Sequence, residues 1–223
     1  TQIQRALSDM TEAYLEGAWR LMSPQYPGIE FAIIAMGRFG GRELGFSSDA
    51  DVVYVVRDAG AGEDTVSQGA ELVRHLIDSV ADPMFPFELD AGLRPEGKNG
   101  PLVRSLEAYQ AYYARWALGW EAQALLRARD IVGDDGLRAE FMTLADTYRF
   151  PESFPAEAST EIRRIKARVE SERLPQGADP ARHVKLGRGS LSDVEWLVQL
   201  LQLQHGFRHP DLQRADTLGS LEA

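Results

Sequence analysis

Two aspartates separated by one residue, Asp49 and Asp51, open an apolar segment rich in valine. In an extended strand, the side chains at positions i and i+2 point to the same side, and each residue advances the chain by about 3.3 Å. Two carboxylates in this arrangement can bind the same divalent cation. Mg²⁺ prefers oxygen ligands and commonly combines one or two carboxylates with substrate phosphates. We therefore expect Asp49 and Asp51 to be catalytic metal ligands in a site for phosphoryl chemistry.

A glycine-rich segment precedes the aspartate pair and directly follows a continuous apolar run at 31–36. Glycine lets the backbone approach a phosphate closely, and exposed backbone amides can form an anion-binding nest. We expect four residues of this segment to bind the phosphates of a nucleotide: Gly37, Arg38, Gly40 and Gly41.

Three residues outside this segment complete the expected site. Asp90 lies in an alternating segment, 85–91, which is typical of a strand. It could supply a third carboxylate that binds a second metal ion or accepts a proton from the nucleophile. Arg94 follows this segment and could contact a triphosphate, and Ser48 could hydrogen-bond a phosphate or close its own loop. An isolated Asp-x-Asp is usually a solvated turn, so the combination of features is what favours catalysis.

Hydrophobic periodicity predicts the elements that must position these side chains. Helices are expected at 3–22 and 66–80, and strands at 31–36, 49–56 and 85–91. The segments at 37–48 and 58–63 are expected to be irregular or turns.

The pattern becomes helical after about residue 100, with helices expected at 106–126, 137–148 and 159–171 and from Ser190 onward. We therefore predict an α+β protein. Residues 1–100 would form a small mixed-sheet domain with an N-terminal helix, and residues 101–223 would form a helical domain.

Composition and charge restrict the class of protein. The chain has 223 residues, of which 44% are hydrophobic and 26% charged, an ordinary globular balance. No apolar run approaches the roughly 20 residues of a membrane helix, and the lack of cysteine excludes disulfides and zinc–thiolate sites. We expect a cytoplasmic protein without a membrane partner. A net charge of −10 also argues against a nucleic-acid partner.

The sequence MGRFGGRELGFSSDAD at 36–51 resembles the nucleotidyltransferase motif of the glutamine synthetase adenylyltransferase family, bacterial enzymes of the polymerase-beta superfamily. The similarity continues in order along the chain, at 93–97, 100–103, 120–129 and 187–196. The chain starts without Met and stops inside an apparent helix, so we expect it to be a piece of a longer protein.

The resemblance implies a polymerase-beta-like nucleotidyltransferase fold that uses two Mg²⁺ ions and ATP as the substrate. It implies transfer of AMP to a tyrosine of glutamine synthetase, with release of pyrophosphate, in the regulation of nitrogen metabolism. A nitrogen-signalling regulatory protein and glutamine are the effectors it suggests. The metal ligands of the family correspond to Asp49 and Asp51, and its third acid corresponds to Asp90.

Two alternatives remain open. The family also contains a second, similar domain that removes AMP by phosphorolysis and releases ADP. The segment at 190–196 resembles the carboxy-terminal, adenylylating copy of actinobacterial forms, which favours transfer over removal. The other alternative is a nucleotide-sensing module without turnover, although a sensor would not need all three aspartates.

Some residues allow a simpler interpretation. We expect Trp116 and Trp120 to lie in the core, and Glu43 to hold the glycine-rich segment. Arg127 and Arg129 could contact a triphosphate or could form buried ion pairs.

Overall fold

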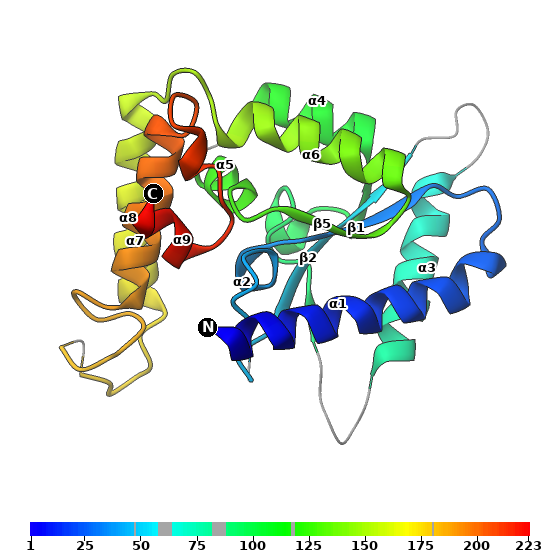
Figure 1. Cartoon of the computed structure of the whole chain (residues 1–223), viewed down its shortest axis with the longest axis horizontal. Coiled ribbons are helices and arrows are strands. Elements are labelled where there is room, and N and C mark those ends of the chain that lie inside the picture. The colour runs from blue at the N-terminus through cyan, green and yellow to red at the C-terminus, as the bar shows by residue number, and fades with distance from the viewer. Residues whose placement is uncertain (47, 58–63, 82–87, 117–118, 180) are drawn as a thin grey trace.

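A mixed β-sheet lies at the centre of the chain (Figure 1). The computed structural model describes residues 1–46, 48–57, 64–81, 88–116, 119–179 and 181–223. Within these ranges the sheet has five strands, in the order β3-β2-β1-β5, with β4 also paired to β2. The strands are β1 (Phe31–Ala35), β2 (Ala50–Val56), β3 (Leu89–Asp90), β4 (Val103–Ser105) and β5 (Arg129–Gly133).

Strand β2 has partners along both of its edges. It pairs antiparallel with β1, and β1 pairs antiparallel with β5 on its other side. On the opposite edge of β2, β3 pairs in parallel with Ala50 and Asp51, and β4 pairs in parallel with residues 54–56. This double pairing fixes both ends of β2, including the end that carries Asp51.

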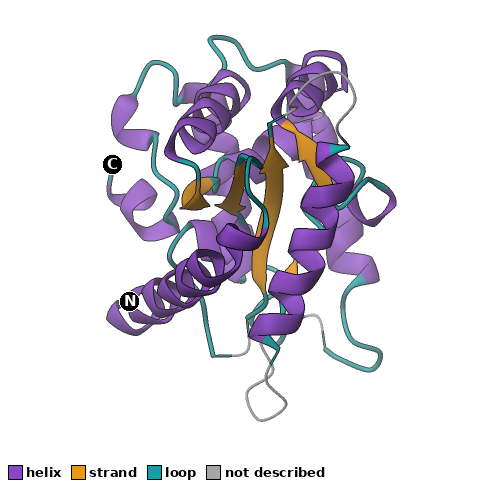
Figure 2. Cartoon of the chain, turned by 90° about the vertical axis from the view of Figure 1, so that its right-hand side faces the viewer, coloured by secondary structure: helices purple, strands orange, loops and turns teal. Residues whose placement is uncertain are grey.

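Helices cover both faces of the sheet (Figures 1 and 2). The helices of the sheet region are α1 (Gln2–Met22), α2 (Gly37–Gly40), α3 (Thr65–Val80), α4 (Leu106–Trp116), α5 (Gly119–Leu125) and α6 (Asp135–Arg149). Beyond them follow α7 (Ala156–Glu172), α8 (Leu191–His205) and α9 (Thr217–Glu222).

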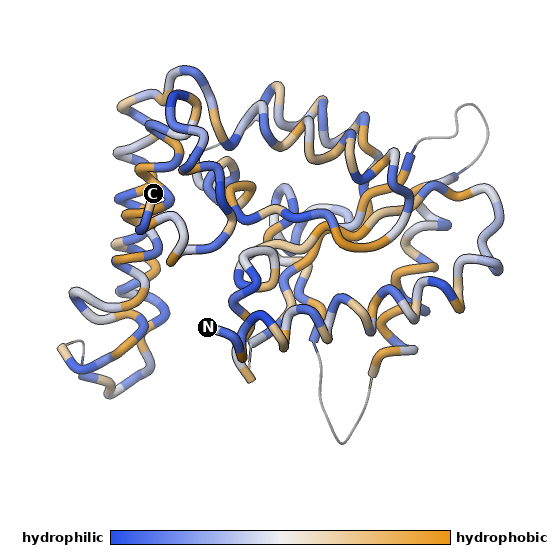
Figure 3. The backbone as a smooth tube through the Cα atoms, viewed as in Figure 1, coloured by the Kyte–Doolittle hydropathy of each residue, from blue (hydrophilic) through white to orange (hydrophobic). Residues whose placement is uncertain are grey.

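The alternation of strand side chains explains the two layers of helices. In β1, Phe31 and Ile33 pack into an apolar cluster with α1 and α3, whereas Ala32 and Ile34 pack into a second cluster with α4 and α6. Both faces of β1 are therefore buried, as the uninterrupted apolar run predicts. Figure 3 shows the same central strands as the most hydrophobic part of the backbone tube.

A third apolar cluster joins α7 and α8 to the sheet region. It contains Ala122 and Leu126 at α5, Ile162 of α7, and Leu200 and Leu203 of α8. α7 and α8 stand together at one end of the molecule, at the left in Figure 1. They pack against α5.

The expected elements before residue 81 are present, with one difference. Helices α1 and α3 and strands β1 and β2 match their predicted ranges within two residues. The segment predicted to be irregular after residue 36 instead begins with the one-turn helix α2. The predicted turn at 58–63 and the first part of the predicted strand 85–91 lie outside the described residues.

The sheet extends past the predicted boundary at residue 100, because β4 and β5 belong to it. We did not predict these two strands, since they have only three and five residues and show no clear alternation. The predicted helix at 106–126 corresponds to α4 and α5, on either side of residues 117–118, which are not described. None of the helices among the described residues is long and apolar enough to cross a bilayer.

Candidate active site

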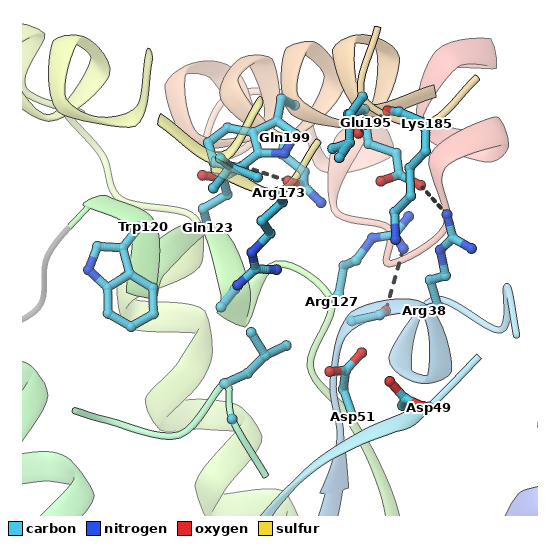
Figure 4. Close-up of a pocket in the computed structure, with 18 of the residues that line it drawn as sticks. Arg38, Asp49, Asp51, Trp120, Gln123, Arg127, Arg173, Lys185, Glu195 and Gln199 are labelled. Atoms are coloured by element: carbon cyan, nitrogen blue, oxygen red, sulfur yellow. Dashed lines mark hydrogen bonds and ion pairs between the residues drawn. The ribbon is translucent and has the colours of Figure 1, made fainter. Parts of the chain in front are cut away.

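The three predicted carboxylates come together where β2 begins. The parallel pairing of β2 with β3 places Asp51 opposite Asp90, and adjacent strands lie about 4.8 Å apart. Asp49 precedes β2 and is two residues from Asp51. All three side chains line one cavity, and Figure 4 shows the carboxylates of Asp49 and Asp51 pointing into it. We refer to Asp49, Asp51 and Asp90 as the acidic cluster.

The electrostatics of the acidic cluster are most evident at Asp51. Burial, together with the charges of Asp90 and Asp49, raises the pKa of its carboxyl from 3.8 to about 6. The backbone N–H of Arg38 and the charge of Lys185 oppose this shift. The cluster therefore concentrates negative charge that a cation would offset.

The first two residues of the glycine-rich segment lie beside the acidic cluster. Gly37 and Arg38 both line it. Gly37 has a φ of 50°, in the left-handed region, and a Cβ atom there would collide with the Asp51 carboxylate. The backbone N–H of Arg38 is hydrogen-bonded to Asp51. These residues therefore hold the carboxylate of Asp51 in place.

Gly40 and Gly41 serve packing, and they are not among the residues that line the cavity. A Cβ atom on Gly40 would collide with the carbonyl oxygen of Arg127, and one on Gly41 would lie 2.8 Å from the carbonyl oxygen of Ala215. Their predicted contact with a nucleotide stays a prediction. A glycine permits the close approach of a phosphate and of a neighbouring backbone segment alike. Only the fold shows which of the two lies beside it.

Arg94 also lies outside the cavity lining. Its guanidinium donates to the carbonyl oxygens of Ala91 at 2.7 Å, Gly100 at 3.0 Å and Lys98 at 3.3 Å. These bonds hold the loop after β3 and direct Arg94 toward backbone, and the predicted contact with a triphosphate stays a prediction. Ser48 lines the cavity, and its hydroxyl oxygen accepts a bond from the Gly45 N–H at 3.0 Å, so it also closes its loop.

The other arginines singled out in the sequence form ion pairs. Arg127 lines the cavity and pairs with Glu43, which also accepts a bond from the Thr217 N–H at 2.9 Å. Glu43 thus joins the glycine-rich segment to α9. Arg129 pairs with Glu12 at 2.6 Å and donates to the carbonyl oxygen of Gly40 at 3.1 Å. Arg129 therefore has a structural role.

The acidic cluster forms one side of a cavity of about 880 Å³, a size typical of small-molecule sites. Three helices complete the cavity, and each presents residues spaced by one helical turn. We call this set the helical wall; it consists of Trp120, Gln123 and Ala124 on α5, Ile165 and Val169 on α7, and Ser192, Glu195, Trp196 and Gln199 on α8.

Two cations on the helical side of the cavity were missed in the sequence. Arg173 follows α7 and Lys185 precedes α8, and both line the cavity. Neither side chain forms an ion pair or hydrogen bond within the described residues, whereas Arg38 pairs with Glu195 at 3.7 Å. Figure 4 shows both side chains extending from the helical side. The nearby similarity at 187–196 was the only sequence signal for this region.

The acidic cluster fits a divalent cation by the chemistry of its donors. Among the described residues, no three Asp, Glu, His or Cys side chains already have the arrangement of a complete metal site. Mg²⁺, however, usually retains water and substrate phosphates beside one or two carboxylates. The hard oxygen donors and the excess negative charge at Asp51 are what such an ion requires. Asp49, Asp51 and Asp90 are therefore the candidate metal ligands.

A glycine substitution tests the packing role of Gly40. Because a methyl group would collide with the Arg127 backbone, Gly40→Ala should lower the free energy of unfolding by roughly 1–3 kcal/mol. Gly17→Ala is the control, since Gly17 lies inside α1 with open space around it. Urea denaturation measures both. A stable Gly40→Ala protein that no longer binds nucleotide would instead support the original prediction.

The raised pKa of Asp51, caused first by burial and then by the neighbouring charges, predicts a pH-dependent stability. A carboxyl whose pKa is raised on folding does not lower the free energy of unfolding at a pH below its pKa in the unfolded state. Its destabilising effect grows as the pH rises from that pKa to the pKa in the folded state. In EDTA, Asp51→Asn should therefore match the wild type near pH 4 and exceed it above pH 6.5, by on the order of 2 kcal/mol. Urea denaturation at the two pH values measures this, with exposed Asp78→Asn as the control. A pH-independent difference would contradict the charge assignment.

Comparisons with known proteins identify the family. A family model described as glutamate-ammonia ligase adenylyltransferase matches residues 1–144, which include all five strands and the acidic cluster. Three relatives each carry the name bifunctional glutamine synthetase adenylyltransferase/adenylyl-removing enzyme. The protein of Leifsonia xyli is 58% identical over 99% of this chain, that of Streptomyces avermitilis 51% over 98%, and that of Mycobacterium marinum 50% over 100%.

The aligned region covers 22%, 23% and 24% of those three proteins, so the chain spans less than a quarter of their length. Because the family model matches residues 1–144, which are more than half of the chain, the chain belongs to the glutamate-ammonia ligase adenylyltransferase family.

Proposed function

We propose that this chain is a Mg²⁺-dependent nucleotidyltransferase domain with a polymerase-beta-like fold. It would transfer AMP from ATP to a tyrosine of glutamine synthetase and release pyrophosphate. The observation that carries the proposal is the register of β2 and β3, which pairs Asp51 with Asp90 at the edge of a cavity large enough for a nucleotide. Family membership supports the choice of substrates, because the relatives are named for this reaction and its reversal.

The residues of the acidic cluster divide into two roles. Asp49 and Asp51 would hold Mg²⁺, with Asp90 contributing from the neighbouring strand. When bound, Mg²⁺ neutralises phosphate charge and helps to align the reacting groups. Asp90 is also the candidate base: its carboxylate would accept the hydroxyl proton while the tyrosine oxygen bonds to the α-phosphorus. The bond from that phosphorus to the pyrophosphate oxygen would then break.

The cations of the helical side support a triphosphate as the ligand. Arg94 donates to backbone carbonyl oxygens, Arg129 pairs with Glu12, and Arg127 pairs with Glu43. Arg173 and Lys185 are the cavity cations without such a partner in the described part of the chain. Two extra positive charges suit the longer tail of ATP better than a single orthophosphate, which favours transfer over phosphorolysis.

The adenylyl-removing activity is the second candidate, because the same relatives are named for both reactions. It would use the same acidic cluster, with orthophosphate as the attacking group and ADP as the product. We propose transfer as the main direction, and glutamine and a nitrogen-signalling regulatory protein as effectors of the whole enzyme. A nucleotide sensor without turnover is the third candidate.

The direction of reaction can be measured with two substrate pairs. Unmodified glutamine synthetase with Mg²⁺-ATP should yield pyrophosphate, and adenylylated glutamine synthetase with orthophosphate should yield little ADP. Asp49→Asn and Asp51→Asn should each lower the rate by at least about 100-fold, because a charge-stabilising group is lost. Asp90→Asn should be equally slow but should still bind Mg²⁺-ATP. Asp78→Asn is the exposed control.

Each outcome of this assay selects one candidate. Faster release of ADP from the adenylylated substrate would identify the removing domain. Binding of ATP without either product would identify a sensor. Wild-type rates in Asp49→Asn or Asp51→Asn at saturating Mg²⁺ would refute the assignment of the metal ligands.

Lys185 and Arg173 predict a difference between long and short phosphate tails. Lys185→Gln and Arg173→Gln should each weaken ATP binding by about 5-fold, as expected for a loss of about 1 kcal/mol, and should affect AMP less. Lys98→Gln is the matched control, because Lys98 is exposed and lies outside the cavity lining. Calorimetric titration measures all three variants. Equal losses for AMP and ATP would contradict a role at the tail.

A further inference from the structure

The helical wall carries aromatic and amide side chains that the proposed transfer step does not use. Trp120 and Gln123 lie one turn apart on α5, and Trp196 and Gln199 lie one turn apart on α8. The two helices are in contact, through side chains of the third apolar cluster among others. The charged side chains of the cavity, which include the acidic cluster, Arg38, Glu195 and Lys185, are separate from these residues.

Trp120 is not the core residue that its spacing predicts. Its indole is half-buried, lines the cavity, and belongs to none of the three apolar clusters formed by the described residues. Trp116, also predicted to be core, is 55% exposed and lies under the Arg115 guanidinium. An indole that faces a cavity offers a flat surface on which a base can stack.

The two glutamines beside Trp120 form a polar pair inside the cavity. The Nε2 of Gln123 donates to the Oε1 of Gln199 at 2.7 Å, and Gln123 is only 6% exposed. Each amide carries two N–H donors and one carbonyl acceptor. After this bond, the pair retains further donors and an acceptor for a ligand. Figure 4 shows this pair on the same side of the cavity as Trp120.

We propose that Trp120, Gln123 and Gln199 form the subsite for the purine base of the nucleotide. The base would stack on the Trp120 indole, and its polar edge would bond to the glutamine amides. The phosphates would then extend toward Lys185 and the acidic cluster, across the same cavity. This arrangement rests on the proposed function, since it takes a nucleotide as the ligand, but it assigns residues that the phosphoryl chemistry does not involve.

The test compares a nucleotide with its phosphate tail alone. Dissociation constants of the 223-residue chain are measured by calorimetry for Mg²⁺-ATP and for Mg²⁺-tripolyphosphate. Trp120→Ala should weaken ATP binding by about 10-fold, as expected for the loss of one stacked base, and should leave tripolyphosphate binding unchanged. Trp120→Phe should retain most of the affinity for ATP, because a phenyl ring can still stack. Gln199→Leu should weaken the binding of ATP and leave the binding of tripolyphosphate unchanged.

Trp116→Ala is the matched control, since this tryptophan is exposed and does not line the cavity. This substitution should change neither the dissociation constant for ATP nor that for tripolyphosphate. Near-UV circular dichroism checks the fold, and if Trp120→Ala does not fold, Trp120→Phe and Gln199→Leu decide the question. The proposal is overturned if Trp120→Ala binds ATP like the wild type, or if both ligands lose affinity equally.

The outcome for the wild-type chain separates this proposal from the proposed function. If the chain binds neither ligand, a nucleotidyltransferase site is refuted. If it binds ATP no more tightly than tripolyphosphate, the phosphate site stands and the base subsite is refuted.

Discussion

The parallel pairing of β2 with β3 is the interaction on which the candidate site depends. It places Asp51 directly beside Asp90, although like charges at this separation repel each other and burial raises the cost. The arrangement persists because the rest of β2 is fixed elsewhere. β1 pairs with one edge, β4 pairs with the other edge beyond β3, and helices bury both faces. The stability of the core thus holds the carboxylates in an unfavourable arrangement that a divalent cation would relieve.

The glycine-rich segment connects this strand to the helical side of the cavity. Gly37 and Arg38 contact Asp51, Gly40 packs on the Arg127 backbone, and Glu43 joins Arg127 to Thr217. A further ion pair, between Arg38 and Glu195, spans from α2 to α8. Segments up to 174 residues apart in the chain are thereby held around one cavity. The helical side of the cavity is therefore tied to the strand that carries Asp51.

This division of the cavity bears on how one family can carry two opposed reactions, as the names of the relatives state. In the function we propose, the acidic cluster would stabilise a charged phosphoryl transition state in either reaction. The cations and the helical wall are the parts that would distinguish a triphosphate from a single phosphate.

The sequence by itself determined the local features: the same-side carboxylates of Asp49 and Asp51, the buried run of β1, and the helices on either side. Each follows from a periodicity of two or 3.6 residues, which is a property of the chain within one element. The tertiary structure decided that Asp90 lies beside Asp51, that Arg94 bonds to its own loop, and that Gly40 and Gly41 face backbone. It also decided that Trp120 and Gln199 share a cavity with the aspartates. These outcomes depend on which strands pair and which helix faces meet, and those contacts join residues too far apart in the chain for any local pattern to specify.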